Sequence, residues 1–447
     1  MAVERPPHVA IVGGGASGVL LACNLARQAN CPAVTLIDPA DEPGPGLAYA
    51  TRCPRHLLNV RNDGMGAMAD DPHHFLAWLR AHVDPLAPAD GFTPRAIFGH
   101  YLRALYAEAG PTHLRGQVVD YQPEGQGGRL TLADGRPVRA DVTVLATGNF
   151  DPAPLAAIDD AVRAAGVYHH TAWDDAVYGA IGQGDPVALI GTGLTAVDVV
   201  LRLRDGDHRG PITAVSRHGL LPSRHAPYEA DGTSPFPDDV PPTARAYLRA
   251  FRAALRRHVP WRAIVDGLRH RTNDLWRALP ETEQRRFRRH LQRRWDIMRH
   301  RIAPAIAAAI DAERAAGTVV IWKGHLDAVT MEDGAAVVAL RSAQGPVSVR
   351  AAHVVNCTGP DMDYCRVDSP LLRSMLARRV IMPGRLGGGL ICDRDGALVD
   401  GQGRASDRLF TLGPARLGVL FESIAIPEIR QQAADLAATL ARRLALP

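Results

Sequence analysis

The distribution of apolar positions along the chain predicts strands that alternate with helices. An apolar run at Val9–Val12 breaks into glycines and resumes with helical periodicity as far as Arg27, and a second apolar run, AVTLID, follows at 33–38. Strand, turn, helix and strand in this order predict a βαβ unit. The same order returns at PVALIGTGLTAVDVVLRLR (186–204), before the strand ITAVS (212–216). The chain therefore contains two candidate βαβ units.

The first glycine turn, GGGASG at 13–18, has the composition of a dinucleotide-binding turn. Gly13 permits the tight turn, Gly15 lets a pyrophosphate approach the backbone, and Gly18 lets the helix pack against the strand. Asp38 ends the next strand, where a carboxylate can accept hydrogen bonds from ribose hydroxyls. The pattern predicts a dinucleotide whose phosphates lie at the helix N-terminus. The alternative is an ordinary glycine-rich turn.

The second glycine turn is followed by different residues. Its predicted nucleotide contacts are Gly191, Gly193, Leu194 and Thr195. The next strand ends at Ser216 and Arg217, and Arg224 lies shortly after. An acid at this place suits a free ribose 2′-hydroxyl, whereas Ser and Arg suit a 2′-phosphate. We therefore predict FAD at the first turn and NADPH at the second. The alternative is that Ser216 and Arg217 are the solvated end of a strand.

A block rich in arginine and in helix-forming residues occupies 241–317. Within it, apolar residues recur at helical spacing and predict a buried face, with the arginines between them on the solvated side: Phe287, Leu291, Trp295, Met298 and Ile302. Strand patterns return at TVVIW, AAVVAL and HVVNCTG, and a last turn leads to a C-terminal helix from about residue 427.

These patterns predict an α/β protein with two Rossmann-like dinucleotide-binding domains and an α-helical insertion. The FAD-binding domain is expected at 1–155 and 320–447. The NAD(P)-binding domain is expected at 156–240, and in a second division of the chain it continues to 355. The helical insertion is expected at 241–317.

Composition narrows the function classes. The chain has 447 residues and a net charge of +4, so its overall charge does not favour a nucleic-acid partner. Six cysteines form no C-x-x-C pair, and the histidine pairs 73/74 and 169/170 lack metal-ligand spacing, so neither a dithiol centre nor a metal site is expected. With no apolar run of membrane-spanning length and no leader pattern, a cytoplasmic location without a membrane partner is expected.

Several blocks of sequence resemble one group of flavoproteins. They are GPGLAYATRCPRHLLNV (44–60), DDPHHFLAWL (70–79), FTPRAIFGHYL (92–102), WDIMRHRIAP (295–304) and LFTLGPARLGVLFESIAIPEIRQQA (409–433). Together with the two glycine turns and the strand ending ATG at 146–148, they are similar to FAD/NAD(P)-binding proteins with two dinucleotide-binding domains, related to class B flavin monooxygenases and N-hydroxylases. This family is chemically diverse, so the resemblance implies the cofactors more specifically than the substrate.

The resemblance also implies roles for single residues. It places FAD at Gly13, Gly15, Ser17, Gly18 and Asp38, with Thr147 and Gly148 beside it. The backbone amides from Glu422 to Ile424 are expected to face the pyrimidine side of the flavin, where helix N-terminal donors stabilise an anionic reduced ring. Asn59 is either a flavin-side amide or an asparagine that stabilises its loop.

The chain departs from the family pattern at two places. After LLNV, similar proteins continue with small residues and proline, whereas this chain has Arg61-Asn62-Asp63-Gly64-Met65. A charged loop near the flavin favours a polar substrate, with Arg61 meeting a carboxylate and Asp63 in the same loop; exposed loop charges are the alternative. The stretch GVYHHTAWDD (166–175) matches the class B fingerprint only in part, because its His-to-Trp spacing is one residue short.

The expected function is that of an FAD-dependent, NADPH-consuming monooxygenase. By its resemblance, it would oxygenate a heteroatom of a small polar substrate with O₂ through a C4a-(hydro)peroxyflavin, with N-hydroxylation favoured. Asn59, Arg61 and Asp63 are the candidate catalytic residues. One alternative is an NADPH oxidase or another flavin oxidoreductase. An alternative of another class is an FAD-stabilised RNA-binding protein that uses the arginine-rich insertion. Oligomeric state and substrate identity stay open at this stage.

Overall fold

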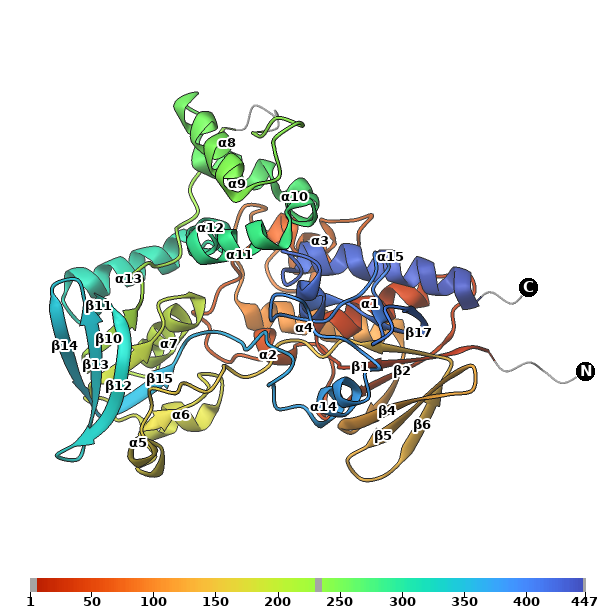
Figure 1. Cartoon of the computed structure of the whole chain (residues 1–447), viewed down its shortest axis with the longest axis horizontal. Helices are drawn as coiled ribbons and strands as arrows, with labels where there is room; N and C mark the ends of the chain where they lie inside the picture. Colours follow the sequence, from red (N-terminus) through yellow and green to blue (C-terminus); the bar gives the residue numbers. More distant parts are fainter. Residues whose placement is uncertain (1–5, 230–234, 445–447) are drawn as a thin grey trace, which may run out of the picture.

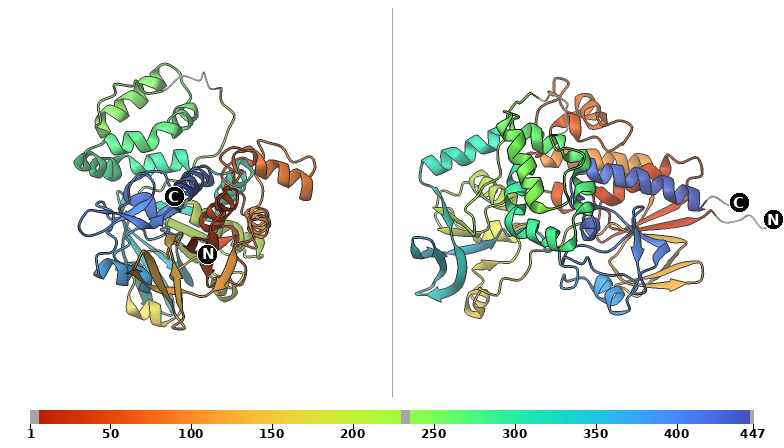
Figure 2. Two further views of the ribbon diagram at one scale, coloured as in Figure 1. Left: turned by 90° about the vertical axis from the view of Figure 1, so that its right-hand side faces the viewer. Right: turned by 45° about the horizontal axis from the view of Figure 1, so that its top comes forward.

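The computed structural model describes residues 6–229 and 235–444. Two parallel sheets form the centres of two bodies that lie side by side, and each carries a three-stranded antiparallel sheet at its outer side (Figure 1). A group of helices projects from the top of this pair, and both chain ends lie at the same end of the molecule (Figure 1). Figure 2 shows the projecting helices from two further directions.

The first parallel sheet has the strand order β16-β17-β7-β1-β2-β3. Its strands are β1 (His8–Val12), β2 (Ala33–Asp38), β3 (Thr112–Arg115), β7 (Val142–Leu145), β17 (Ala405–Thr411) and the antiparallel edge strand β16 (Ala397–Val399). Among its helices are α1 (Ala16–Ala26), α2 (Gly46–Tyr49), α3 (His74–His82), α4 (Arg95–Ala109), α14 (Pro370–Ala377) and α15 (Ile426–Leu444). The antiparallel strands are β4 (Val118–Glu124), β5 (Gly127–Leu132) and β6 (Pro137–Ala140).

The second parallel sheet has the order β11-β10-β9-β15-β8. Its strands are β8 (Tyr168–His169), β9 (Val187–Ile190), β10 (Ile212–Ser216), β11 (Val319–Lys323) and β15 (His353–Asn356). Its helices are α5 (Asp160–Ala164), α6 (Asp175–Ala180), α7 (Leu194–Asp205) and α13 (Pro304–Ala315). The antiparallel strands are β12 (His325–Glu332), β13 (Ala335–Ser342) and β14 (Gly345–Ala351). The two bodies thus repeat one plan.

The helical insertion lies between β10 and β11. It comprises α8 (Ala244–Arg256), α9 (Trp261–Gly267), α10 (Thr272–Ala278), α11 (Glu281–His290) and α12 (Gln292–Arg299), with the 3-10 helix η2 (Arg269–Arg271). The range expected for the insertion, 241–317, also includes α13, whose Ile306, Ala307 and Ile310 are buried in the core of the second sheet. The apolar repeat predicted over 287–302 falls on two separate helices, because the chain breaks at Leu291.

Strand pairing also bears on the division into domains. β11 and β15 pair within the second sheet, and the separate antiparallel sheet β12–β14 lies between them along the chain. β16 and β17 belong to the first sheet. We therefore propose an FAD-binding domain from residues 6–155 and 357–444, and an NAD(P)-binding domain from 156–356 that carries the insertion. This corresponds to the second of the two divisions expected from the sequence, in which the NAD(P)-binding domain continues to 355.

A buried ion pair joins the two bodies. Arg95 at the start of α4 donates to both carboxylate oxygens of Asp198 on α7, at 2.8 and 3.3 Å. The side chains of Arg95 and Asp198 are only 13% and 5% exposed. His56 contributes a third contact, because its Nε2 lies 2.8 Å from the backbone oxygen of Asp198. Loss of either partner would leave the other charge buried and unpaired, which is strongly destabilising.

Candidate functional site

The first glycine turn has the geometry of a phosphate-binding loop. Gly13 has a φ of +112°, and a Cβ at this position would lie 2.2 Å from the oxygen of Ala146, so only glycine fits. A Cβ on Gly18 would lie 2.0 Å from the oxygen of Gly13. A Cβ on Gly15, in contrast, would meet only the Cα of Gly46 at 3.5 Å, so its Cα faces open space. The predicted close approach of a pyrophosphate is therefore sterically available at Gly15.

Helix α1 offers its N-terminus to the same space. No side chain caps it, and its first turn contains no acidic residue, so its amides and its dipole are available to an anion. Asp38 ends β2 and accepts hydrogen bonds from the amides of Gly14 at 2.6 Å and Ala40 at 2.8 Å. Thr147 and Gly148 follow β7, and the Thr147 amide lies 3.4 Å from the Cβ position of Gly13. These residues fit the adenosine and phosphate part of FAD.

Gly413 connects the C-terminal segment to this turn. Its Cβ position lies only 2.6 Å from the Oγ of Ser17, and its φ is +74°. Its amide donates to Oε1 of Gln432 at 2.9 Å, and its oxygen accepts from the hydroxyl of Ser423 at 2.6 Å. Gln432 also donates to Ser423 at 2.9 Å. This buried network fixes the turn that precedes α15 against the first glycine turn.

The amides expected to face the flavin, from Glu422 to Ile424, are only partly available. Asn273 of the insertion accepts hydrogen bonds from the amides of Phe421 and Glu422, both at 2.9 Å, and donates to the oxygen of Glu422 at 3.0 Å. The Glu422 amide is therefore hydrogen-bonded to the insertion and is not available to a flavin. Within the described part of the chain, the amides of Ser423 and Ile424 have no partner, and the Ile424 side chain is 42% exposed.

The carboxylate of Glu422 is buried between the insertion and this turn. It accepts a hydrogen bond from Nε1 of Trp295 at 3.0 Å and lies 3.5 Å from Arg299, while Arg299 also pairs with Glu428 at 3.0 Å. Asp296 lies near Glu422, and burial raises the pKa of the Asp296 carboxyl to about 7. The helix α12 thus brings acidic and basic groups to the boundary between the two bodies.

The second glycine turn repeats the geometry of the first. Gly191 has a φ of +122°, and its Cβ position lies 2.3 Å from the oxygen of Cys357. Gly193 caps α7 without a side-chain hydrogen bond, and its Cβ position meets only Nη1 of Arg293 at 4.0 Å. Leu194 and Thr195 form the first turn of α7, which contains no acidic residue. An anion can approach this turn as it can the first.

Ser216 is placed at the end of β10 but its hydroxyl is already engaged. Its Oγ lies 2.8 Å from the hydroxyl of Thr192 and accepts a hydrogen bond from the amide of Gly219 at 3.0 Å. Arg217 is exposed, as is Arg224. The backbone of Arg224 pairs with that of Ile302, which follows the last helix of the insertion, α12. Arg224 is therefore positioned by this pairing and not by the end of β10.

The structure adds cations that the sequence did not indicate. Lys323, the only lysine of the chain, ends β11 in register with Ser216. The pKa of His218 is lowered by burial and then by its neighbours Arg217, Arg293, Lys323 and Arg294. Residues from β10, α12 and β11 therefore form a cationic cluster next to the second glycine turn. Nothing in the sequence placed Lys323 or the arginines of α12 near Arg217, because they are far apart along the chain.

The loop with the candidate catalytic residues contacts the segment that follows β10. Asn59 is half-buried, and its backbone oxygen lies 3.0 Å from Nε2 of His225, on the segment after β10. Tyr228 donates to Oδ2 of Asp266 at 2.5 Å, and Arg301 donates to the other oxygen of that carboxylate. The other residues of this group are distant from Asn59 in the sequence, and no sequence motif indicated them: His225, Tyr228, Asp266 and Arg301.

Arg61 lies beside this group. It is half-buried, and its positive charge acts to lower the pKa values of both His225 and Tyr228. Among residues 6–229 and 235–444, Arg61 has no ion-pair or side-chain hydrogen-bond partner. Asp63 lies in the 3-10 helix η1 (Asn62–Gly64), and its amide bonds to the oxygen of Ala89. Burial lowers the pKa of His225 to about 4 and raises that of Tyr228 to about 12, so both are uncharged at neutral pH.

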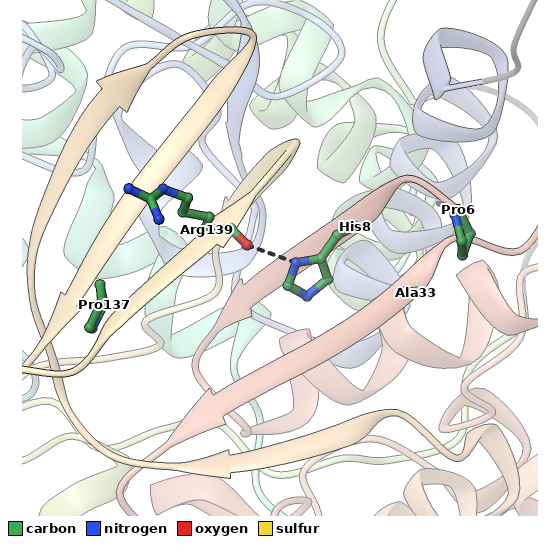
Figure 3. A pocket seen from close by; sticks show the side chains of 5 residues that line it. All are labelled: Pro6, His8, Ala33, Pro137 and Arg139. Atoms are coloured by element: carbon green, nitrogen blue, oxygen red, sulfur yellow. Dashed lines mark hydrogen bonds between the residues drawn. The ribbon is translucent and has the colours of Figure 1, made fainter. Parts of the chain in front are cut away.

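A hollow lies at the end of the first sheet where the strands β1 and β2 begin (Figure 3). It is lined by Pro6, His8, Ala33, Pro137 and Arg139. The ring of His8 bonds to the oxygen of Arg139 and to the hydroxyl of Thr35, both at 2.8 Å. Because the parallel strands β1 and β2 begin here and the glycine turn follows the carboxyl end of β1, this hollow is remote from the nucleotide turn.

The described residues contain no group of three or more His, Cys, Asp or Glu arranged to hold a metal ion. In the same part of the chain, no helix has the length and apolar character needed to cross a bilayer.

Comparison with known sequences supports the assignment of the first turn. Residues 10–150 match the model of a family described as FAD-NAD(P)-binding. A protein of Escherichia coli (strain K12) named uncharacterized protein YdhS is 23% identical over 271 residues, which covers 51% of this chain and 48% of YdhS. The match thus spans about half the length of each of the two proteins.

Comparison with solved structures covers nearly the whole chain. The cadaverine monooxygenase DfoA of Erwinia amylovora, solved with FAD, is 13% identical, with a TM-score of 0.68 over 99% of this chain and 95% of DfoA. The ornithine N-hydroxylase KtzI of Kutzneria sp. 744, in a complex with reduced FAD, NADP⁺ and L-Orn, is 15% identical, with a TM-score of 0.66 over 98% of this chain and 100% of KtzI. Residues 10–150 thus match an FAD-NAD(P)-binding family model, and the chain as a whole shares the fold of DfoA and KtzI.

Proposed function

We propose that this protein is an FAD- and NADPH-dependent monooxygenase that oxygenates a heteroatom of a small polar substrate, with an amine nitrogen favoured. The observation that carries the proposal is the presence of two open glycine turns within one fold, the second of which adjoins a cationic cluster. A helix N-terminus binds a pyrophosphate in each case, and the cations add recognition of a 2′-phosphate. The fold shared with DfoA and KtzI agrees with this division of roles.

The flavin supplies the redox chemistry when bound, since it accepts hydride from NADPH and reacts with O₂. The residues of the chain bind and orient the two nucleotides and the substrate. Asp38 and the α1 N-terminus hold one nucleotide, and the α7 N-terminus with Arg217 and Lys323 holds the other. Helix α12 of the insertion contacts both bodies, through Arg293 and Thr192 on one side and through Trp295 and Glu422 on the other.

Arg61 is the group proposed to meet the substrate. It is a half-buried guanidinium without a partner among the described residues, so a substrate carboxylate would satisfy it. Asp266 is already held by Tyr228 and Arg301, which leaves it a positioning role for these two side chains. An amino acid or a similar amine that bears a carboxylate fits this arrangement best. Asn59 and Asp63 lie in the same loop as Arg61 and are the other residues proposed to act in catalysis.

The test is the coupling of NADPH oxidation to product formation. NADPH consumption, O₂ uptake and hydrogen peroxide release are measured together for amines, amino acids and thioethers. A monooxygenase shows faster NADPH consumption with its substrate and peroxide release below one equivalent per NADPH. Stoichiometric peroxide with every compound would support an NADPH oxidase instead. Salt-sensitive RNA binding without NADPH consumption would support the binding-protein alternative.

A further inference from the structure

A cavity with a mainly apolar lining lies within the helical insertion and extends to Leu220, beside the second glycine turn. It has a volume of about 650 Å³, within the ~300–1,000 Å³ typical of small-molecule pockets. Residues of α8, α10, α11 and α12 line it, and Phe421 closes it on the side of the turn before α15. The apolar repeat expected to be a buried face, which includes Phe287 and Trp295, is therefore in large part the wall of this cavity.

Aromatic side chains form one wall of the cavity. The ring of Phe421 lies 4.8 Å from that of Trp276 and 5.4 Å from that of Phe287, and the rings of Trp276 and Phe287 are 6.1 Å apart. Leucines of α8 and α10 line the cavity as well. A wall of this kind recognises an apolar body by area burial rather than by hydrogen bonds.

Three polar side chains of the wall, those of Tyr247, Thr272 and Trp295, are already hydrogen-bonded within the protein. The hydroxyl of Tyr247 donates to the oxygen of Leu275 at 2.9 Å, and the hydroxyl of Thr272 donates to the oxygen of Leu268 at 2.9 Å. Nε1 of Trp295 donates to Glu422 at 3.0 Å. The body of a ligand therefore finds few free hydrogen-bonding groups inside the cavity, which selects against a polar molecule.

The charged residues at the cavity are all basic. Arg252, His290 and Arg294 line it and are exposed, so they lie at its opening. No Asp or Glu occurs among the described residues that line it. Within that part of the chain, Arg252 and Arg294 have no acidic partner. An anionic group at the opening would thus pair with guanidinium groups that are otherwise solvated.

We propose that this cavity is a binding site for an amphipathic anion, with an alkyl body in the aromatic and leucine-lined interior and a carboxylate at Arg252 and Arg294. Leu220 lines the cavity and its oxygen accepts a hydrogen bond from the hydroxyl of Thr192, in the second glycine turn, at 2.7 Å. Arg294 also belongs to the cationic cluster beside that turn. The site therefore adjoins the second glycine turn, but its occupant does not depend on the monooxygenase assignment. It borders the turn that precedes α15, because Phe421 is common to both.

The test is direct binding of alkyl carboxylates to the purified full-length protein by calorimetry. Affinity should rise from hexanoate through octanoate to decanoate by about fourfold per methylene, which corresponds to ~0.8 kcal/mol. Decyltrimethylammonium, which has the same chain and the opposite charge, should bind at least tenfold more weakly than decanoate. Affinity independent of chain length, or equal binding of the cation, would overturn the proposal.

Two pairs of variants locate the site. Arg252→Glu should weaken decanoate at least tenfold, whereas Arg249→Glu, exposed on the same helix outside the cavity, should not. Leu248→Trp should occupy the cavity and weaken decanoate, whereas Leu86→Trp, at a side chain that is 88% exposed, should not. Because Arg252 is exposed, its variant remains informative even if Leu248→Trp fails to fold. Equal effects within the Arg252 and Arg249 pair would overturn the assignment.

Two further outcomes would assign the cavity to another occupant and overturn the proposal. One is a change of oligomeric state in Leu248→Trp, measured by sedimentation, which would indicate a second copy of the chain. The other is binding to phosphatidylglycerol vesicles without binding of free decanoate, which would indicate a membrane surface.

Discussion

Lys323 provides the sharpest test of coenzyme recognition. It is the only lysine of the chain and lies in register with Ser216 at the ends of two neighbouring parallel strands. The substitution Lys323→Ala removes the ammonium group but leaves the backbone pairing of β10 and β11, which does not use the side chain. We expect kcat/KM for NADPH to fall while kcat/KM for NADH stays unchanged, because only NADPH carries the 2′-phosphate.

The size of the effect follows from the exposure of Lys323. Two unit charges 4 Å apart interact by about 1 kcal/mol in bulk water and about 4 kcal/mol at an effective dielectric constant near 20. Lys323 is exposed, so the lower part of this range applies, although a phosphate carries nearly two charges. A loss of about 1 to 2 kcal/mol lowers kcat/KM for NADPH about 5- to 30-fold. Arg217→Ala, which removes a two-point donor, should cost about 10- to 100-fold.

The assay is steady-state oxidation of each coenzyme at increasing ionic strength. The loss in Lys323→Ala should shrink with salt, because the Debye length falls from about 10 Å at 0.1 M to about 3 Å at 1 M. Arg394→Ala, which removes an exposed cation of the other body, is the matched control and should change neither coenzyme. Equal use of NADPH and NADH by the unsubstituted protein would refute the reasoning. An equal loss for both coenzymes in Lys323→Ala would show that the residue acts on folding rather than on the phosphate.

Four other perturbations test the remaining parts of the site. Gly15→Val should abolish tight FAD binding, measured by flavin absorbance after gel filtration; full occupancy would show that the first turn is misassigned. Arg61→Ala should raise KM for a carboxylate-bearing substrate at least tenfold and leave NADPH binding unchanged, whereas an unchanged KM would remove its proposed role. Arg95→Ala should lower the free energy of unfolding in urea by about 3–5 kcal/mol, since it leaves the Asp198 carboxylate buried and unpaired; a loss below about 1 kcal/mol would contradict this. Because burial lowers the pKa of His225 from 6.5 to about 4, the unfolded chain takes up a proton in this window that the folded chain does not, so stability should fall as the pH decreases from 6.5 to 4. His225→Gln should flatten that decrease, and an unchanged pH dependence would show that other groups cause it.

The sequence by itself determined the local units. The strand at Ala33–Asp38 and the strand at Ile212–Ser216 have the predicted bounds, and the C-terminal helix begins within a residue of its predicted start. Apolar runs and glycine turns act over a few residues, so their consequences can be read without knowing the rest of the fold. The predicted steric roles of Gly13, Gly15 and Gly18 agree with the space around them for the same reason.

Tertiary structure alone decided which distant segments meet. Lys323 and the arginines of α12 join Arg217 because β11 pairs with β10 across an insertion, and the sequence carries no periodicity that reports this pairing. The amide of Glu422 is occupied because Asn273 reaches it from the insertion, which a local pattern cannot show.

The apolar repeat of the insertion illustrates the same limit. Helical spacing shows that Phe287 and Trp295 avoid water, but it does not distinguish a face packed against protein from the wall of a cavity. That distinction depends on how α8 and α10 are placed opposite α11 and α12. Such placement follows from non-local packing and not from the order of residues within one helix.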